Sequence, residues 1–122
     1  MPSIFRIAVL LFAGAVAHSN AAAAAPAAAA AARGEAFFHR DFGQSARMPA
    51  CASCPTDDPR RPGRHVVTDK PIAPLAPAAN PERFTNPAKV EKWFRRNCSE
   101  VVGRECSAAE KADLIAYLEG VR

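Results

Sequence analysis

The chain has 122 residues and a net charge of +4, with 16 Lys and Arg against 12 Asp and Glu. This mild charge, and a basic cluster at Arg60, Arg61 and Arg64 without aromatic neighbours, argue against nucleic-acid binding. We interpret the cluster as a solvated face or as a docking site for an acidic partner. Four cysteines in so short a chain are typical of an exported protein in an oxidising compartment.

The first residues have the plan of a secretory signal peptide. Arg6 precedes an apolar run at 7–16 that is too short to span a bilayer. Small residues then offer cleavage after Ala17 or after Ala21. We therefore predict a signal peptide at 1–21, a periplasmic location, and no membrane span after cleavage.

A low-complexity, Ala-rich segment follows at 22–32. We expect it to be a linker that becomes helical only near its end, ahead of a single domain at 33–122. The first helix of that domain is predicted at about 34–40, with Phe37 and Phe38 as its apolar contacts.

Cys51 and Cys54 form a C-x-x-C pair that is followed by Pro55. The motif that attaches haem in c-type cytochromes has histidine at that next position, and C-x-x-C alone also occurs in redox dithiols and zinc half-sites. A redox dithiol normally lies beside a βαβ fold, and no segment of this chain has a convincing strand pattern. Zinc bound by all four cysteines is the weaker alternative, because seven residues separate the second pair.

Residues 55–85 have almost no helical or strand periodicity. The prolines in this segment are Pro55, Pro59, Pro62, Pro71, Pro74, Pro77 and Pro81. Such a long loop is unusual in a small domain, which itself usually needs a disulfide, a metal or a cofactor. We therefore expect the loop to wrap a large, flat, apolar cofactor through Ile72 and Leu75, the alternative being a disordered loop.

A second helix is predicted to begin at Asn86-Pro87, a capping side chain followed by proline at the first helical position. One face of this helix carries Val90, Trp93, Phe94 and Asn97. An amide on a half-apolar face needs a partner for its polar atoms. An iron or an iron-bound water is one such partner for Asn97, and the helix backbone is another.

The third helix is predicted to open with a capping box, in which Ser107 is followed three residues later by Glu110. Its core-facing residues are Leu114, Ile115, Tyr117 and Leu118. With three helices and no clear strand, the chain is predicted to be all-α.

Three features resemble the plan of class I cytochromes c: Gly34 four residues before Phe38, the Cys51–Cys54 pair, and the 114–118 pattern Leu-x-x-Tyr-Leu. Other segments look closely like the sphaeroides haem protein family; they are 69–77, 83–85, 90–93, 96–98, 103–104 and 110–114. The resemblance covers roughly 33–118. It implies an all-α, class I cytochrome c-like fold with three main helices and a long Pro-rich loop around haem.

Members of that family are small periplasmic monohaem cytochromes c with an asparagine on the distal side of the iron. The resemblance implies haem c bound through Cys51 and Cys54, with Asn97 as its weak distal ligand. It also implies a disulfide between Cys98 and Cys106. The residues that would pack against the haem are Trp93, Ile72 and Leu75. The implied function is that of an electron carrier rather than an enzyme. O₂ or another diatomic would bind by displacing the asparagine. The electron donors would be other periplasmic or membrane c-type cytochromes.

The family's proximal ligand falls on Pro55, which has no imidazole and disfavours helical geometry at Cys54. Three interpretations stay open. The first is a single-base change or sequence error in a working cytochrome, and the second is a degenerate member that no longer takes haem. The third is replacement of the ligand by His65 or His39. A C-x-x-C thiol–disulfide protein is the remaining alternative.

Overall fold

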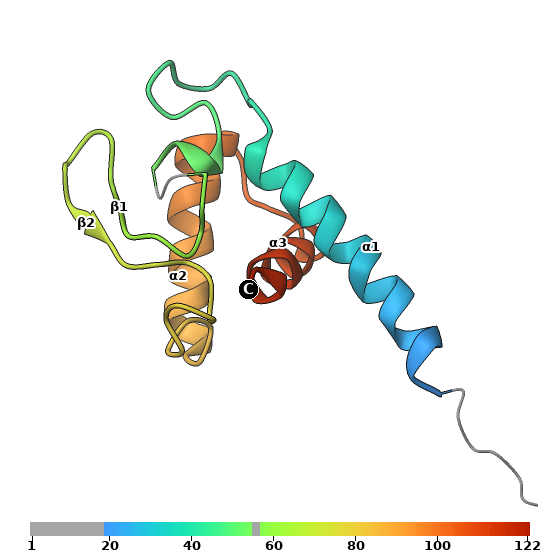
Figure 1. The fold of residues 1–122 in the computed structure, drawn as a ribbon. Coiled ribbons are helices and arrows are strands. Elements are labelled where there is room, and N and C mark those ends of the chain that lie inside the picture. The colour runs from blue at the N-terminus through green and yellow to red at the C-terminus, as the bar shows by residue number, and fades with distance from the viewer. Residues whose placement is uncertain (1–18, 55–56) are drawn as a thin grey trace, which may run out of the picture.

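The computed structural model describes residues 19–54 and 57–122, so Pro55 and most of the expected signal peptide lie outside the described residues. Three helices form the body of the fold (Figure 1). They are α1 (Ser19–His39), α2 (Pro87–Asn97) and α3 (Ala108–Gly120). The short elements are the 3₁₀ turn η1 (Cys51–Ser53), the π-helical turn η2 (Cys98–Val102), and the strands β1 (Gly63–Arg64) and β2 (Pro71–Ile72). In the part of the chain that is described, no helix is long and apolar enough to cross a membrane.

Helix α1 is longer than the sequence led us to expect. The linker at 22–32 was predicted to become helical only near its end, but α1 already begins at Ser19 and continues through Pro26. Residues 24–29 are exposed, so packing does not explain their helicity. Alanine has the highest intrinsic helix propensity, and an uninterrupted alanine tract on either side of Pro26 offsets the cost of that one proline.

The frame of the domain is a close crossing of α1 and α3 (Figure 1). Gly34 is buried at the crossing, and a Cβ atom there would collide with the backbone carbonyl of Asp113. Phe38 is fully buried one turn further on, with its ring 5.6 Å from that of Tyr117. The helices therefore approach so closely only because position 34 has no side chain.

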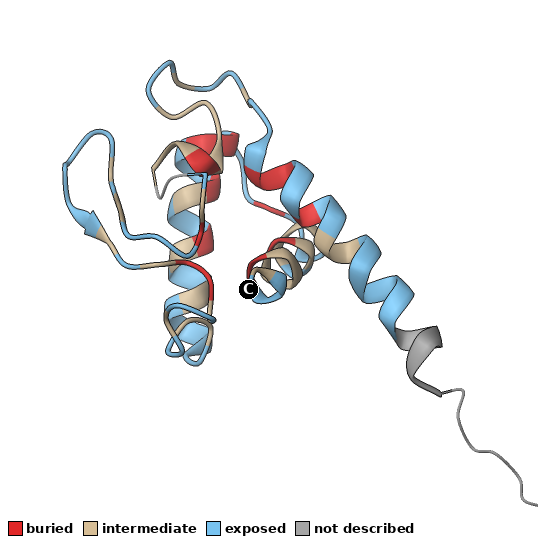
Figure 2. Ribbon diagram, in the orientation of Figure 1, coloured by how far each residue is buried: buried red, intermediate tan, exposed pale blue. Residues whose placement is uncertain are grey.

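The buried faces of the three helices meet in one core (Figure 2). Its members include Phe37, Phe38, Ala52, Leu75, Phe94, Cys98, Val102, Cys106, Leu114 and Leu118. The predicted contacts from α1 are confirmed, as are those of Leu114 and Leu118 from α3, whereas Ile115 and Tyr117 are only half-buried.

Both predicted helix starts are confirmed. Pro87 is the first residue of α2, and Oδ1 of Asn86 accepts a hydrogen bond of 3.1 Å from the backbone N–H of Lys89. At α3, the Ser107 hydroxyl accepts from the N–H of Glu110 at 3.2 Å, and the Glu110 carboxylate accepts from the N–H of Ser107 at 2.8 Å. These caps fix the chain positions at which α2 and α3 begin.

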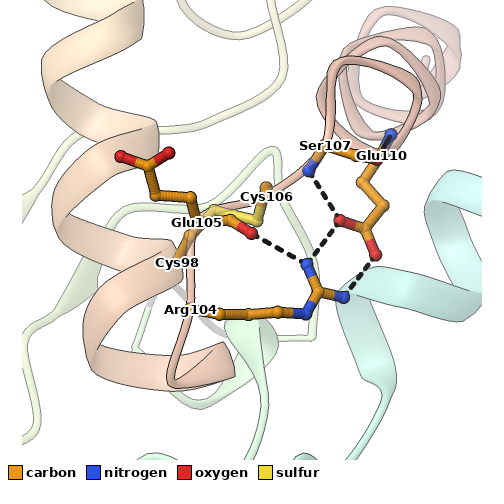
Figure 3. A network of polar contacts seen from close by, with 6 residues as sticks. All are labelled: Cys98, Arg104, Glu105, Cys106, Ser107 and Glu110. Atoms are coloured by element: carbon orange, nitrogen blue, oxygen red, sulfur yellow. Dashed lines mark hydrogen bonds and ion pairs between the residues drawn. A yellow bond between two sulfur atoms is a disulfide. The ribbon is translucent and has the colours of Figure 1, made fainter.

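The end of α2 is tied to the start of α3 by a disulfide and an ion pair (Figure 3). Cys98 and Cys106 are bonded, as the resemblance implied. Between them, the guanidinium of Arg104 donates to both carboxylate oxygens of Glu110, at 2.7 and 2.9 Å. This hydrogen bonding holds the pKa of Glu110 at about 2, well below its usual value. Glu110 therefore both caps α3 and holds the turn that follows α2.

A small antiparallel ribbon was missed by sequence reasoning. β1 and β2 pair with Gly63 opposite Ile72 and Arg64 opposite Pro71. Two residues per strand are too few to show an alternating pattern, and Pro71 argues against a strand where it occurs. The expectation of no strand is therefore corrected, although the fold remains helical.

The Pro-rich loop is held by hydrogen bonds to its own backbone. The N–H of Leu75 donates to the carbonyl of Pro59 at 2.8 Å. The guanidinium of Arg83 donates to the carbonyls of Pro74 and Ala73, at 2.8 and 2.6 Å. Leu75 is buried as predicted, and these bonds bring the loop against the N-terminal half of α2.

Gly34→Ala should lower the free energy of unfolding by about 1–3 kcal/mol, because the added methyl group must push α3 away from α1. Thermal unfolding followed by circular dichroism measures the loss. Gly120→Ala is the matched control: a Cβ there meets nothing within 4 Å, and alanine in a helix is at least as favourable as glycine. Equal melting temperatures for the two variants would contradict the crossing described above.

Glu110→Gln should remove a stabilisation that depends on pH. Because the pKa of Glu110 is lowered to about 2 in the folded chain, its contribution is complete above the unfolded value of about 4.3 and is lost as the pH falls toward 2. The difference in melting temperature between wild type and variant should therefore be largest near pH 7 and vanish near pH 2. Glu119→Gln, on the exposed end of α3, controls for loss of charge alone. A difference that does not change with pH would refute the role given to the ion pair.

Candidate functional site

A pocket of about 130 Å³ lies between α2, α3 and the end of the Pro-rich loop. Its apolar walls come from Leu75, Phe84, Val90, Trp93 and Leu118. Two predicted packing residues, Leu75 and Trp93, are therefore brought together. The third, Ile72, is half-buried against the same core but does not line the pocket.

Phe84 takes a backbone conformation that side-chain-bearing residues rarely adopt, with φ at +62°. A single residue of this kind costs about 1–2 kcal/mol. The ring of Phe84 is half-buried and forms part of the pocket wall. The strain therefore occurs in a residue that shapes the pocket rather than in an exposed turn.

Asn97, the last residue of α2, lies at a second hollow of about 270 Å³. Cations border it at Lys89, Lys92 and Arg96, and Trp93 is shared with the apolar pocket. The Asn97 side chain is half-buried, and its Nδ2 donates to the carbonyl of Trp93 at 2.9 Å. Within the described residues no donor is hydrogen-bonded to its Oδ1. The amide oxygen is thus available as an acceptor or as a weak ligand.

Cys51 and Cys54 are both free, half-buried thiols on and just after η1. In Figure 1 this short green turn lies level with the C-terminal end of α2. Burial raises the pKa of the Cys51 thiol to about 11. A thiol with so high a pKa is almost wholly protonated near neutral pH and is a poor nucleophile.

The other two cysteines are joined in the disulfide, so they are not available as thiolate ligands. Among residues 19–54 and 57–122, no group of three or more His, Cys, Asp or Glu side chains is placed to hold a metal ion. The four-cysteine zinc alternative is therefore unsupported by the geometry.

His65, one of the two candidate replacement ligands, is engaged elsewhere. Its Nδ1 accepts from the backbone N–H groups of Val67 and Thr68, both at 3.3 Å. Its Nε2 lies 3.6 Å from a carboxylate oxygen of Glu100 in η2. Both ring nitrogens thus face partners within the chain, and His65 does not line the pocket.

His39, the other candidate, is exposed at the end of α1. Its ring contacts those of Phe38 and Tyr117, at centroid distances of 5.1 and 6.4 Å. It also lies outside the pocket lining. A proximal ligand therefore stays unassigned, and position 55 itself lies beyond the described residues.

The basic cluster of the loop is paired with nearby carboxylates. Arg60 and Arg61 lie 2.9 and 3.8 Å from Asp58, and Arg64 lies 3.1 Å from Asp69. Local pairing of this kind favours the solvated-face interpretation over a docking site.

Sequence reasoning missed most of the residues that line the pocket, among them Leu118, Arg83 and Phe84. Leu118 was expected only in the core. It also lines the pocket, because of the way in which α3 meets the loop. Arg83 and Phe84 lie in a segment without periodicity, where no pattern indicates which side chains turn inward. Only the fold of the loop reveals them.

The chemistry of these residues suits haem, although none of Cys51, Cys54 and Asn97 lines the apolar pocket. Cys51 and Cys54 would form the thioether bonds, the apolar side chains of the pocket would pack against the porphyrin, and Asn97 would be a weak ligand of the iron. The fit fails on the proximal side, because the described histidines are directed elsewhere and residue 55 is proline.

Comparison with known proteins gives consistent results. A family model described as "Domain of unknown function (DUF1924)" matches residues 24–118. The chain is 48% identical over 86 residues to cytochrome c'' of Methylophilus methylotrophus, which covers 70% of this chain and 60% of that protein. It is 49% identical over 87 residues to the cytochrome c-type protein SHP of Cereibacter sphaeroides, which covers 70% of this chain and 67% of that protein. The match thus spans less than two thirds of the length of cytochrome c''.

Solved structures agree with these matches. Oxidized SHP, described as an oxygen-binding cytochrome c, superposes with a TM-score of 0.67 at 46% identity, covering 82% of this chain and 95% of that one. Oxidized cytochrome c'' from Methylophilus methylotrophus gives 0.64 at 42% identity, covering 75% of this chain and 76% of that one. The helical cytochrome c fold is thereby confirmed. The chain belongs to the DUF1924 family and, with SHP and cytochrome c'', to the c-type cytochromes that resemble the sphaeroides haem protein.

Proposed function

We propose that this protein is a periplasmic monohaem cytochrome that carries electrons and binds O₂ or another diatomic when Asn97 is displaced. The observation that carries the proposal is the Asn97 amide, which lies at a hollow beside Trp93 with Oδ1 free of any described donor. Its electron donors would be other periplasmic or membrane c-type cytochromes. The bound haem would supply the iron that exchanges electrons and takes the diatomic.

Asn97 could bind the iron only weakly, so that another ligand could still displace it. A neutral amide oxygen is a weaker ligand than imidazole or thioether, the usual axial groups of c-type cytochromes. When Asn97 swings away, its Nδ2 can keep the 2.9 Å hydrogen bond to Trp93 only if the motion is small. This hydrogen bond would thus restrain the amide, and a larger displacement of Asn97 would have to break it.

Two alternatives compete with this function. The haem-free interpretation rests on Pro55 and requires that the pocket stay without a cofactor. The thiol–disulfide interpretation requires a reactive thiolate, and burial that raises the pKa of Cys51 to about 11 disfavours it.

Intact mass after co-expression with cytochrome c maturation genes tests covalent attachment, measured on denatured and reduced protein. Pro55→His restores the complete motif and should gain the mass of one haem through Cys51 and Cys54. The natural chain, run in parallel, should gain the same mass if the proposal holds without the motif histidine. Haem in the variant alone would mean that the chain has the fold but has lost the cofactor. Haem in neither would overturn the proposed function.

Asn97→Ala, made in haem-loaded Pro55→His protein, should speed the binding of carbon monoxide to the reduced form. The alanine cannot occupy the distal position, so the displacement step disappears. Stopped-flow absorbance measures the on-rate, and Asn80→Ala, an asparagine of the loop that donates to the Pro74 carbonyl instead, is the control. Identical on-rates for Asn97→Ala and its parent would rule out Asn97 as a barrier to the ligand.

Cys51 should react slowly with iodoacetamide in the folded, haem-free chain. With a pKa of about 11, its thiolate fraction at pH 8 is about 0.001, roughly two orders of magnitude below that of an ordinary thiol. Mass spectrometry of peptides gives the rate. The same reaction in guanidinium chloride is the control, since unfolding removes the burial. Fast, burial-independent alkylation would revive the thiol–disulfide interpretation.

A further inference from the structure

Helix α2 concentrates positive charge that the rest of the described chain does not neutralise. Its four cations are Lys89, Lys92, Arg95 and Arg96. Its single carboxylate, Glu91, pairs instead with Lys111 of α3, at 2.7 Å. Among residues 19–54 and 57–122, the side chains of Lys89, Lys92 and Arg96 have no hydrogen-bond or ion-pair partner. The basic cluster of the loop, by contrast, is paired with carboxylates of its own segment.

These three unpaired cations share one face of α2. Lys89, Lys92 and Arg96 follow the spacing i, i+3, i+7, which places them in a row about 10 Å long. All three are exposed. They border the hollow of about 270 Å³ that is also lined by the half-buried Trp93 and Asn97. The face is therefore a row of cations beside an indole ring and an amide.

This arrangement of charge lowers the stability of α2. Lys89 lies in the first turn, where the helix dipole favours a carboxylate, and the first turn of α2 has no acidic residue. The like charges of Lys89 and Lys92, and of Lys92 and Arg96, repel each other because residues three and four apart are neighbours on a helix. Of the three, only Arg96, in the last turn, has the sign that the dipole favours. Helix stability therefore does not account for the row, whereas neutralisation by carboxylates from outside the chain would.

The chemistry of this face fits an acidic protein surface better than a membrane or a nucleic acid. Insertion into a membrane requires exposed apolar side chains, and Trp93, the aromatic residue that lines the hollow, is half-buried. Nucleic acids are bound through extended basic patches, whereas this row is short and the net charge of the chain is only +4. Exposed charges around a surface hollow are typical of weak, salt-sensitive association between two proteins.

We propose that this face of α2 is a docking face for the acidic surface of a partner protein, with Lys89, Lys92 and Arg96 opposite the partner's carboxylates. The inference rests on the proposed function and deepens it, because the face contains Asn97, the residue proposed to ligate the iron. The partner would be one of the electron donors. Complementary charges speed the encounter and orient the partner, while contacts between exposed charges leave the complex short-lived. Such a face suits a carrier that must bind and release its donor repeatedly.

Isothermal titration calorimetry of the full chain tests the docking face. The probe is flavodoxin, a small electron-transfer protein with an acidic surface. The natural protein is purified after co-expression with maturation genes and is used whether or not it carries haem, because the measured quantity is the dissociation constant of the two proteins. Wild type should bind flavodoxin at about 20 mM sodium chloride. The affinity should fall by about tenfold or more at about 200 mM, because salt screens the interaction of exposed charges.

Charge reversal assigns the binding to α2. Lys89→Glu should weaken binding about fivefold or more. A carboxylate in the first turn stabilises the helix, so a loss of fold does not explain this result. Lys92→Glu, in the middle of the row, should weaken binding by a similar factor. The control is Lys70→Glu, at an exposed loop lysine outside the hollow: it changes the net charge equally and should change the dissociation constant less than about twofold.

Three results would overturn this inference: no association with flavodoxin at low salt, equal losses of affinity in Lys70→Glu and Lys89→Glu, or tighter binding to phosphatidylglycerol vesicles than to flavodoxin. The last result would assign the face to a membrane. These outcomes are separate from those of the intact-mass experiment. A chain that docks but never gains haem would keep the docking face and lose the proposed function. A haem-loaded chain that does not dock would lose only the docking face.

Discussion

The position of α2 depends on the disulfide between Cys98 and Cys106, which anchors the end of that helix to the start of α3. Closing so short a loop contributes about 2–3 kcal/mol in the loop-entropy model. Asn97 directly precedes the first of these cysteines, so its position follows from the bond. The ion pair of Arg104 with Glu110 reinforces the same connection through the capping box of α3.

At its N-terminal end, α2 is fixed by the cap at Asn86. The loop before it is held together by a hydrogen bond from Arg83 to a carbonyl of the same loop. Helix α3, to which α2 is tied, is in turn held by its close crossing with α1 at Gly34. The pocket wall formed by Val90 and Trp93 therefore rests on contacts that the chain makes on its own.

The helix starts could be predicted, because short-range sequence signals determine them. Asn86-Pro87 and the Ser107 capping box are short-range signals, and both helices begin where these signals indicate. The alanine tract was misjudged because its low complexity was taken as the sign of a linker, although alanine has the highest intrinsic helix propensity.

What could not be predicted depends on long-range contacts. Arg83 and Phe84 enter the pocket because the loop folds back on Pro59, Ala73 and Pro74, and no periodicity encodes that path. The ribbon of β1 and β2 is too short to leave a pattern. The roles of Cys51, Cys54 and Asn97 came from a resemblance to a family rather than from any pattern in the sequence.

The central claim is that the loop's own hydrogen bonds hold it against α2, and amide hydrogen exchange of the haem-free protein tests it most directly. The N–H groups of Leu75 and Ala76 both donate to the carbonyl of Pro59, at 2.8 and 2.9 Å. They should exchange at least a hundredfold more slowly than in an unstructured chain, as do amides in stable hydrogen bonds. Exchange at the unstructured rate, with α1 and α3 still protected, would show that the loop and pocket form only when a cofactor binds.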